Sequence, residues 1–536
     1  MATDPLPLEP DGIVGLVRDP SGQAVSRGRV VLVPAVDVAS LAKVSLDLSL
    51  APSDAVTFFG DEPIEDLLDQ KAADYTGADV AADGSYRIPA LDTGEYFIVF
   101  QPDPNDEEHL PGGDQCRKAL DQASLVGTRI DIQVSGQPSS AATYVGSTAC
   151  FGCHGRQRSM RSAHRVGLSV PGVRGAFQDV SHFATFDALL ARFDAGATLY
   201  YYDCDPGKSG EAKCSVADAD PTAATPSAVV TFEAHLGRDT GVARTDPGAY
   251  TFTLVNRLGS GSASYAVVLT YGGALHRQRL LTRRTNASGT FSYLVLPLQW
   301  NDAGATTNPS PEDWPLRDAH SEQWYDFTGK KLREPGASDG FDNGCAGCHF
   351  TGMQLAGDAA SGFVARAAAE PNGDFDYDGD GRRDEINVGC EACHGPGSEH
   401  LESEVRGLHI VSPGLLTPER ETLLCGRCHS RPAGVGGGGT EAPLSSAGLM
   451  PRPGMRRADF LASFTTRIDA APGDLYPSGD SRSSHQQYTD FVRSGMYRNR
   501  SVLMTCSSCH DAHGSDDNPH DLRASGDAVC TSCHSS

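Results

Sequence analysis

The chain has 536 residues, a formal net charge of −25 and an apolar fraction of 39%, which is ordinary for a globular protein. This length predicts roughly three or four domains with buried cores. The negative charge argues against nucleic acid and anionic membrane surfaces as partners, and the chain has no run of about 18 apolar residues that could cross a bilayer.

Strand patterns dominate the first quarter of the chain. Residues 11–35 hold two runs rich in Val and Ile around an Asp-Pro-Ser-Gly turn, and residues 83–100 contain two further stretches of alternating apolar residues. The segment TRIDIQV at 128–134 completes the set, before a QPSSAA linker at 137–142. This pattern resembles the carboxypeptidase regulatory-like or transthyretin-like β-sandwich over about residues 11–135. The resemblance implies a role in docking or spacing, not chemistry.

Six copies of the pattern C-x-x-C-H lie in the rest of the chain. In covalent haem c, two thiols form thioethers with the porphyrin and the adjacent imidazole binds iron, which requires this spacing. Zinc ribbons are the alternative, but they need two C-x-x-C arms for each metal and give no reason for a His behind every arm. The motifs therefore predict six haem c groups, attached at Cys150 and Cys153, Cys345 and Cys348, Cys390 and Cys393, Cys425 and Cys428, Cys506 and Cys509, and Cys530 and Cys533, with the proximal iron ligands His154, His349, His394, His429, His510 and His534.

Covalent haem attachment also indicates the compartment. It takes place on the oxidising side of a membrane, so we expect an exported, periplasmic or extracellular protein in which disulfides are permitted. The first residues, MATDPLPLEPDG, lack the charged and apolar regions of an export signal, which favours a mature or engineered chain. Of the three cysteines outside the motifs, Cys204 and Cys214 flank a short polar loop and are predicted to form a disulfide, while the state of Cys116 stays open.

The segments between the motifs differ in character. Residues 157–166 lack Pro and Gly, which predicts a helix carrying His164 after the first motif. Five segments between about 195 and 300 are rich in strand-forming residues and predict a β-rich insertion. From residue 345 onward the motifs are too crowded for a separate apolar core around each one, so we expect the porphyrins themselves to form the core.

An acidic run, DFDYDGDGRRDE, precedes the third motif. It fits a calcium-loop template through Asp374, Asp376, Asp378 and Glu385. A shifted frame uses Asp376, Asp378, Asp380 and Asp384 instead. The alternative is a solvated acidic loop without metal. Because no strongly periodic helix flanks the run, the prediction is an isolated Ca²⁺ loop that clamps the segment entering the third motif.

An ordered set of motifs runs through about residues 143–536. It comprises YVGSTACFGCH with SAH, TYGGALHRQRLL with LPLQW, FDNGCAGCH, CEACHGPGSEH, CGRCHSRP, SSHQQYTDFVRSGMY and CSSCHDAHG. This set resembles multihaem cytochromes c of the cytochrome c554-like type, which are related in haem arrangement to hydroxylamine oxidoreductase and pentahaem nitrite reductase. The resemblance implies stacked haems, most with two His ligands, and it implies distal ligands at His164, His400, His485 and His513. His276 and His320 are further distal candidates.

These observations predict a multidomain protein. An all-β sandwich at 1–140 precedes a haem-packed hexahaem cytochrome c domain at 141–536, mainly α-helical or irregular, with the β-rich insertion at 195–300. The expected function is electron transfer to redox partner proteins or extracellular electron acceptors, with no catalytic residues. Assembly of the chains into a haem-lined filament is compatible with the spare histidines. The alternative is a multihaem oxidoreductase with one open iron, acting on a nitrogen or sulfur oxyanion.

Overall fold

The computed structural model describes residues 6–41, 62–155, 162–171, 194–208, 213–246, 248–272, 277–301, 316–403, 405, 407–436, 442–468, 476–477, 480–482, 485–497, 499–515 and 521–534. Its internal contacts divide the chain into two compact units, each built from two separate stretches. Unit 1 comprises Met1–Val145 and Cys390–His510, and unit 2 comprises Gly146–Gly389 and Asp511–Ser536.

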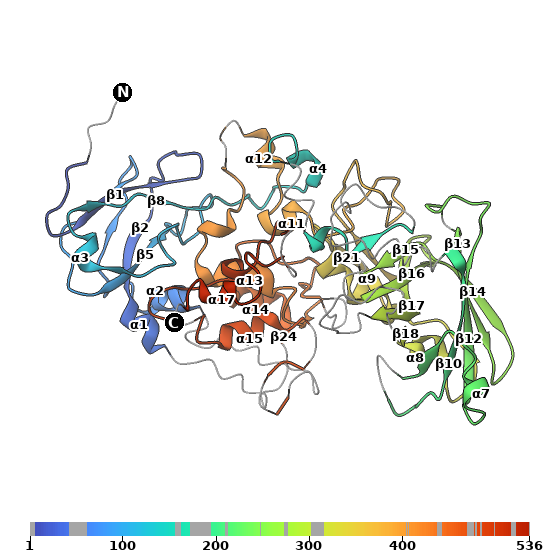
Figure 1. The fold of residues 1–536 in the computed structure, drawn as a ribbon. Coiled ribbons are helices and arrows are strands. Elements are labelled where there is room, and N and C mark those ends of the chain that lie inside the picture. Colours follow the sequence, from blue (N-terminus) through green and yellow to red (C-terminus); the bar gives the residue numbers. More distant parts are fainter. Residues whose placement is uncertain are drawn as a thin grey trace. The chain divides into compact units, whose positions relative to one another are not determined.

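The N-terminal part of unit 1 is a sandwich of two sheets (Figure 1). One sheet has the order β4-β1-β7, with β8 also paired to β1, and the other has the order β3-β2-β5-β6. Apolar side chains such as Val17, Ile98 and Phe100 meet in the core between them. The strands are β1 (Ile13–Arg18), β2 (Arg29–Pro34), β3 (Gly77–Asp79), β4 (Ser85–Ile88), β5 (Glu95–Gln101), β6 (Leu120–Asp121), β7 (Thr128–Arg129) and β8 (Ile132–Gln133), with the short helix α3 (Gln122–Leu125) after β6.

Two helices, α1 (Ala35–Ser40) and α2 (Pro63–Lys71), pack on the opposite face of the β2–β5 sheet. Side chains of this face, including Val31 and Phe97, pack against Ile64 of α2. Because successive side chains of a strand point to opposite faces, covering both faces buries β5 continuously from Tyr96 to Phe100. Leu503, which lies just before the fifth motif, belongs to the same core and ties that motif to the sandwich.

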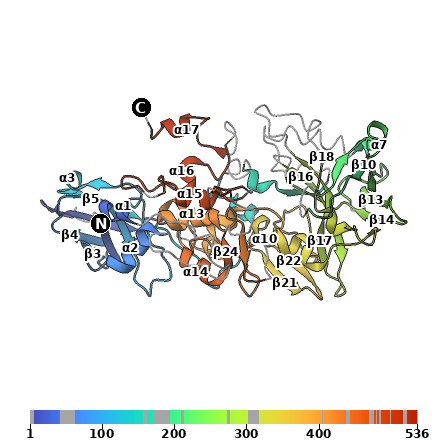
Figure 2. The ribbon, with the colours of Figure 1, turned by 90° about the horizontal axis from the view of Figure 1, so that it is seen from below.

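The rest of unit 1 consists of short helices that carry or support the third, fourth and fifth motifs. Helix α13 packs against α2, α14, α15 and α16 (Figure 2). Leu423, Phe460 and Tyr488 are buried together in a small core among these helices. The elements are α11 (Cys390–His394), α12 (Ser398–Glu402), the 3₁₀ helix η5 (Pro413–Leu415), α13 (Pro418–Gly426), β23 (Pro432–Gly434), α14 (Arg457–Ser463), β24 (Thr465–Ile468), α15 (Gln487–Arg493) and α16 (Cys506–Cys509).

Most of unit 2 is a second β-sandwich. Sheets of order β11-β10-β12-β13-β14 and β18-β17-β16-β15-β9 enclose a core that includes Tyr201, Phe232 and Trp324. A disulfide joins Cys204 to Cys214 at the edge of this core. The strands are β9 (Leu168–Ser169), β10 (Ala197–Tyr202), β11 (Ser215–Ala217), β12 (Val230–Arg238), β13 (Tyr250–Asn256), β14 (Ser262–Ala266), β15 (Leu269–Tyr271), β16 (Arg277–Thr285), β17 (Phe291–Asn301) and β18 (Leu316–Asp318).

The remaining elements of unit 2 are short. They are α4 (Ser147–Cys150), η1 (Ala163–Arg165), α7 (Pro221–Ala224), α8 (Ser321–Trp324), β19 (Tyr325–Asp326), β20 (Lys331–Leu332), η4 (Ala337–Asp339), α9 (Phe341–Gly344), α10 (Ala346–His349), the hairpin β21 (Gln354–Asp358) and β22 (Gly362–Arg366), and α17 (Ala528–Thr531). Of the helix predicted at 157–166, residues 156–161 lie outside the described residues, and Ala163–Arg165 form a 3₁₀ turn. No helix within the described ranges has the length and apolar character needed to cross a membrane.

Candidate haem sites

Each C-x-x-C-H motif forms a single helical turn. The backbone N–H of His154 donates to the carbonyl of Cys150 over 2.9 Å, and His429, His510 and His534 repeat this bond to the first cysteine of their motifs. The third motif is helical throughout as α11, and the second forms α10. Side chains at positions i, i+3 and i+4 of a helical turn share one face. Both thiols and the imidazole therefore project to the same side, and the residues fit covalent haem c.

The third, fourth and fifth motifs are close together in unit 1. The pKa of Cys393 is raised to about 11, chiefly by burial and also by the nearby thiols of Cys425 and Cys428. Arg427, inside the fourth motif, donates to the carbonyl of Ala392 inside the third. A hydrogen bond with Cys506 of the fifth motif, together with burial, raises the pKa of Cys425 well above its usual value. The fourth motif therefore adjoins both the third and the fifth.

The proximal histidines of the third and fourth motifs are oriented by acceptors. Nδ1 of His394 lies 2.8 Å from the carbonyl oxygen of Val411, so Nδ1 carries the proton and the lone pair is on Nε2. Nδ1 of His429 lies 3.3 Å from Oε1 of Gln487, and burial lowers the pKa of His429. A neutral imidazole with its proton held on Nδ1 is the form that binds a metal ion through Nε2.

His400, a predicted distal ligand, has the same orientation as His394. It lies on α12, and its Nδ1 is 3.0 Å from the carbonyl oxygen of Leu408. A carbonyl oxygen only accepts hydrogen bonds, so the proton is on Nδ1 and Nε2 has the lone pair. The structure thus gives His400 the tautomer required of an iron ligand.

His485, another predicted distal ligand, faces the fourth motif. The ring centroids of His485 and His429 are 6.3 Å apart, with an angle of 41° between the ring planes. Two imidazoles on opposite sides of one metal ion, with bonds of about 2 Å each and half a ring at each end, have centroids separated by roughly 6 Å. The observed separation suits a shared iron. His485 also has a φ of 64°, a left-handed conformation that is uncommon outside glycine.

The other predicted distal ligands that the structure describes lie in unit 2. Nδ1 of His164 is 3.1 Å from Oγ of Ser162, and the carbonyl of His164 accepts from the backbone N–H of Val388. His513 is exposed, with Nδ1 3.7 Å from Asp511. His320 is the N-cap residue of α8, where its Nδ1 is 3.3 Å from Oε1 of Glu322. His276 lies outside the described residues.

Buried charged residues position the first motif. The carboxylate of Glu370 accepts from the backbone N–H of Thr148 over 2.9 Å, in the first turn of α4. Arg165 donates to Oγ of Ser147 and to Oε1 of Glu385, each over 2.7 Å. Both members of the Arg165–Glu385 ion pair are more than nine-tenths buried. The Thr148–Glu370 and Arg165–Glu385 contacts join positions more than 200 residues apart, and no local sequence pattern indicated Arg165 or Glu370.

A buried carboxylate also positions the second motif. Asp342, three residues before Cys345, accepts from the backbone N–H groups of Tyr293 and Ala365 over 2.6 and 2.9 Å. Burial raises the pKa of Asp342 to about 7, although these hydrogen bonds oppose the rise. The motif's His349 lies beside Tyr271, with Nε2 3.3 Å from the phenolic oxygen.

The acidic loop brings together part of its predicted calcium ligand set. Carboxylate oxygens of Asp376, Asp378 and Asp384 lie within 4.8 Å of one another. Burial and the neighbouring carboxylates raise the pKa of Asp384 to about 7. Glu385 instead pairs with Arg165, and the exposed Asp380 lies 3.3 Å from Arg382.

The remaining calcium candidate, Asp374, is exposed, and partial desolvation raises the pKa of its carboxyl group despite the charge of Arg383. Between the clustered carboxylates, Tyr377 is buried and stacks on Tyr293 with ring centroids 3.9 Å apart. Its ring also meets the edge of Phe350, directly after the second motif. The loop thus contacts the residue that follows the second motif, and the predicted clamp on the third motif stays a prediction.

One protein-family model matches part of the chain. A model of the doubled CXXCH motif matches residues 501–536, which contain the fifth and sixth motifs. The match supports a multihaem c-type cytochrome. No curated protein sequence matches the chain.

Among solved structures, the undecahaem cytochrome from the S-layer of Carboxydothermus ferrireducens aligns with a TM-score of 0.30 and 14% sequence identity, covering 73% of this chain. The aligned region spans 43% of that cytochrome's length.

Proposed function

We propose that the protein is an exported hexahaem cytochrome c that conducts electrons, with most of its irons bound by two histidines. The observation that carries the proposal is the shared geometry of the six motifs, in which each helical turn presents two thiols and an imidazole on one face. The match to the doubled CXXCH motif supports the same chemistry at the C-terminal end. When bound, haem c supplies a one-electron couple between ferric and ferrous iron.

The chain's own residues attach the haems and orient their ligands. The carbonyls of Val411 and Leu408 hold the Nδ1 protons of His394 and His400, leaving Nε2 of each to bind iron. We assign His485 as the distal partner of His429 because of their ring separation. His164, His513, His276 and His320 complete the proposed distal set.

The proposed partners are redox proteins or extracellular electron acceptors, and the proposed location is the periplasm or the cell exterior. The acidic composition favours a partner with a basic surface. Assembly of the chains into a filament is part of the proposal, because spare histidines could ligate the iron of a neighbouring chain.

We also propose that the acidic loop binds Ca²⁺ as a structural ion. Asp376, Asp378 and Asp384 offer converging carboxylate oxygens, which are the ligands that Ca²⁺ prefers. Crowded carboxylates repel one another, and a cation would offset this repulsion. Through Tyr377, the ion would stabilise the segment that packs on Phe350.

Electron paramagnetic resonance of the oxidised protein tests the electron-transfer proposal. Two nitrogen ligands make a haem iron low-spin and coordinatively saturated, so we expect mainly low-spin ferric signals that do not change when nitrite or hydroxylamine is added. A large high-spin signal that shifts on addition of either compound would contradict the pure conduit and would support an oxidoreductase with an open iron.

A further inference from the structure

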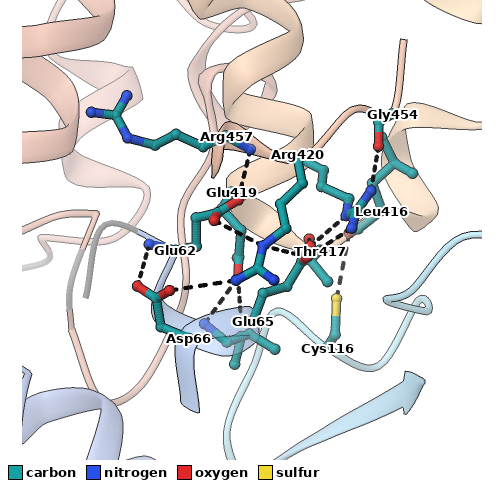
Figure 3. Close-up of polar contacts among 12 residues, drawn as sticks. Glu62, Glu65, Asp66, Cys116, Leu416, Thr417, Glu419, Arg420, Gly454 and Arg457 are labelled. Carbon is teal, nitrogen blue, oxygen red and sulfur yellow. Dashed lines mark hydrogen bonds and ion pairs between the residues drawn. The ribbon is translucent and has the colours of Figure 1, made fainter. Parts of the chain in front are cut away.

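A buried junction of charged residues joins α2 of the sandwich to α13, the helix that leads into the fourth motif (Figure 3). Oε1 of Glu419 accepts from the backbone N–H groups of Ile64 and Glu65, over 2.9 and 2.8 Å, and so caps the N-terminus of α2. In return, the carboxylate of Glu65 accepts from Nε and Nη2 of Arg420 and from the hydroxyl of Thr417. The two helices therefore satisfy each other's polar groups.

A third carboxylate belongs to the same junction. Glu62, just before α2, accepts from the backbone N–H of Arg457 over 2.7 Å and from Nε of Arg456 over 2.9 Å. Glu62, Glu65 and Glu419 are each at most 5% exposed. Three carboxylates are thus buried within one set of contacts, which is costly unless each one is paired or protonated.

Glu419 is the member whose pairing is incomplete. Its second oxygen, Oε2, is buried and has no hydrogen-bond partner in the described part of the chain. Arg420 directs its side chain to Glu65 and to the carbonyl of Gly454, and Arg456 pairs with Glu62 and with Asp69 of α2. The charged and titratable groups around Glu419 are Glu62, Glu65, Arg420, Glu421, Arg456, Arg457, Cys116 and Tyr497.

The three carboxylates differ in the direction in which their pKa values are shifted. Burial raises the pKa of Glu419 to about 8, with a further increase from the charge of Glu65. Burial also raises the pKa of Glu62, to about 7. At Glu65 the charge and hydrogen bonds of Arg420 outweigh burial and lower the pKa. Glu65 is therefore ionised near neutral pH, whereas Glu419 exchanges its proton close to that range.

Two structural links connect the junction to the fourth motif, one starting at Glu419 and the other at Glu62. Cys425 lies six residues further along α13, which is about 9 Å at 1.5 Å per residue. The second link runs from Glu62 through Arg457, whose side chain donates to the hydroxyl of Tyr488 over 2.9 Å. The backbone N–H of Tyr488 in turn donates to the carbonyl of His429.

A cavity provides a place for water between the junction and the motif. Its lining includes Arg420 of the junction and Arg427 of the fourth motif, together with apolar side chains such as Leu423 and Phe460. The space is partly open and has room for about one water molecule, which could pass a proton between the junction and solvent.

We propose that Glu419 is a proton-binding site coupled to the electron held at the fourth motif. Its carboxylate takes up one proton from water when the haem attached to Cys425 and Cys428 gains one electron from a redox partner, and it releases that proton on oxidation. This inference rests on the proposed function. It makes the sandwich part of the electron-transfer machinery, because α2 supplies the backbone donors and the carboxylates that set the proton affinity of Glu419.

The sign of the coupling follows from charge. An added electron makes the region more negative, which favours the protonated form of a nearby acid. A bound proton in turn favours the reduced haem by the same free energy, because linkage between two binding events is reciprocal. Reduction at the fourth motif should therefore become harder as pH rises through the range in which Glu419 loses its proton.

The test is spectroelectrochemical titration of the holoprotein at several pH values between about 6 and 10. For the wild type, we expect one of the midpoint potentials to fall as pH rises near 8. The steepest dependence expected for one proton taken up with one electron is a tenfold change in the reduction equilibrium constant for each pH unit. The variant Glu419→Gln keeps an amide oxygen that can accept from α2 and cannot titrate, so it should lose this slope. The matched control is Glu95→Gln, at an exposed carboxylate on β5 of the same unit, which should titrate like the wild type.

Redox-difference infrared spectroscopy gives a second readout, and its wild-type measurement does not depend on the folding of any variant. Reduction of the wild type should produce the C=O band of a protonated carboxylic acid, and the band should be missing in Glu419→Gln. Wild-type potentials that are independent of pH, or a pH slope and band that persist in Glu419→Gln, would overturn the coupling while leaving the cytochrome assignment intact. Absence of haem at Cys425 and Cys428 in a peptide mass map would instead overturn the proposed function and this inference together.

Discussion

At the scale of single residues, His485 is the ligand assignment that the geometry supports most directly. Replacing it by alanine should remove one axial ligand from the fourth haem and convert that iron from low-spin to high-spin. Electron paramagnetic resonance of the oxidised variant would measure the change. The control is His235→Ala, because His235 lies on β12 of unit 2 and contacts Thr198. An unchanged low-spin spectrum in His485→Ala would rule out His485 as a ligand.

Arg165 should contribute strongly to stability because its removal leaves Glu385 buried without its ion pair. Breaking a buried pair in this way typically costs about 3–5 kcal/mol, so Arg165→Leu should lower the unfolding temperature of unit 2 markedly. Differential scanning calorimetry would detect the shift. Arg382→Leu removes a guanidinium whose side chain is 73% exposed, and it should have almost no effect. Equal stabilities of the two variants would refute the structural role of Arg165.

The sequence identified residues whose chemistry depends on local spacing. The cysteines and proximal histidines lie within five consecutive residues of each motif, so their helical turns follow from the motif itself. Arg165, Glu370 and Asp342 could not be found in this way. Their partners are 220, 222 and up to 49 residues away, and nothing in a single sequence indicates which distant segments will meet.

At the scale of elements, the acidic loop allows a direct test of cation binding. A site of three carboxylates should be stabilised by Ca²⁺, by about 2.7 kcal/mol when the free ion is at 100 times its dissociation constant. Added Ca²⁺ should therefore raise the unfolding temperature of wild-type unit 2, and Asp378→Asn should remove most of this increase. Asp218→Asn, at an exposed carboxylate of the same unit, should respond like the wild type. Unchanged stability of the wild type after removal of Ca²⁺ would count against the site.

Strands with clear alternation coincide with segments identified in the sequence. β13 lies within AYTFTLVN, whereas β12 and β17 overlap SAVVTFEAHL and TFSYLVLPLQW and extend two residues and one residue past their ends. β16 is different, because its sequence RQRLLTRRT is dominated by arginine and polar residues and gives no apolar alternation. Its place in the sheet depends on its neighbours β15 and β17, with which it pairs.

At the scale of the whole molecule, the compact units cross the boundary that the sequence placed at residue 140. Unit 1 combines the sandwich with the third, fourth and fifth motifs, and unit 2 combines the other three motifs with the β-rich insertion. The composition of residues 137–142 indicated a linker between two domains. Within unit 1, however, the contacts of Ile64 and Glu65 with Glu419 join positions more than 350 residues apart in sequence. Composition along the chain carries no signal for such contacts.

The central claim is that all six motifs hold covalent haem c. The most direct test is the intact mass of the exported protein, determined under denaturing conditions that remove non-covalent groups. The expected mass is that of the polypeptide plus six haems, with the twelve motif cysteines unreactive to alkylation because they are thioethers. A mass with fewer than six haems, or motif cysteines that become alkylated after removal of zinc, would contradict the claim.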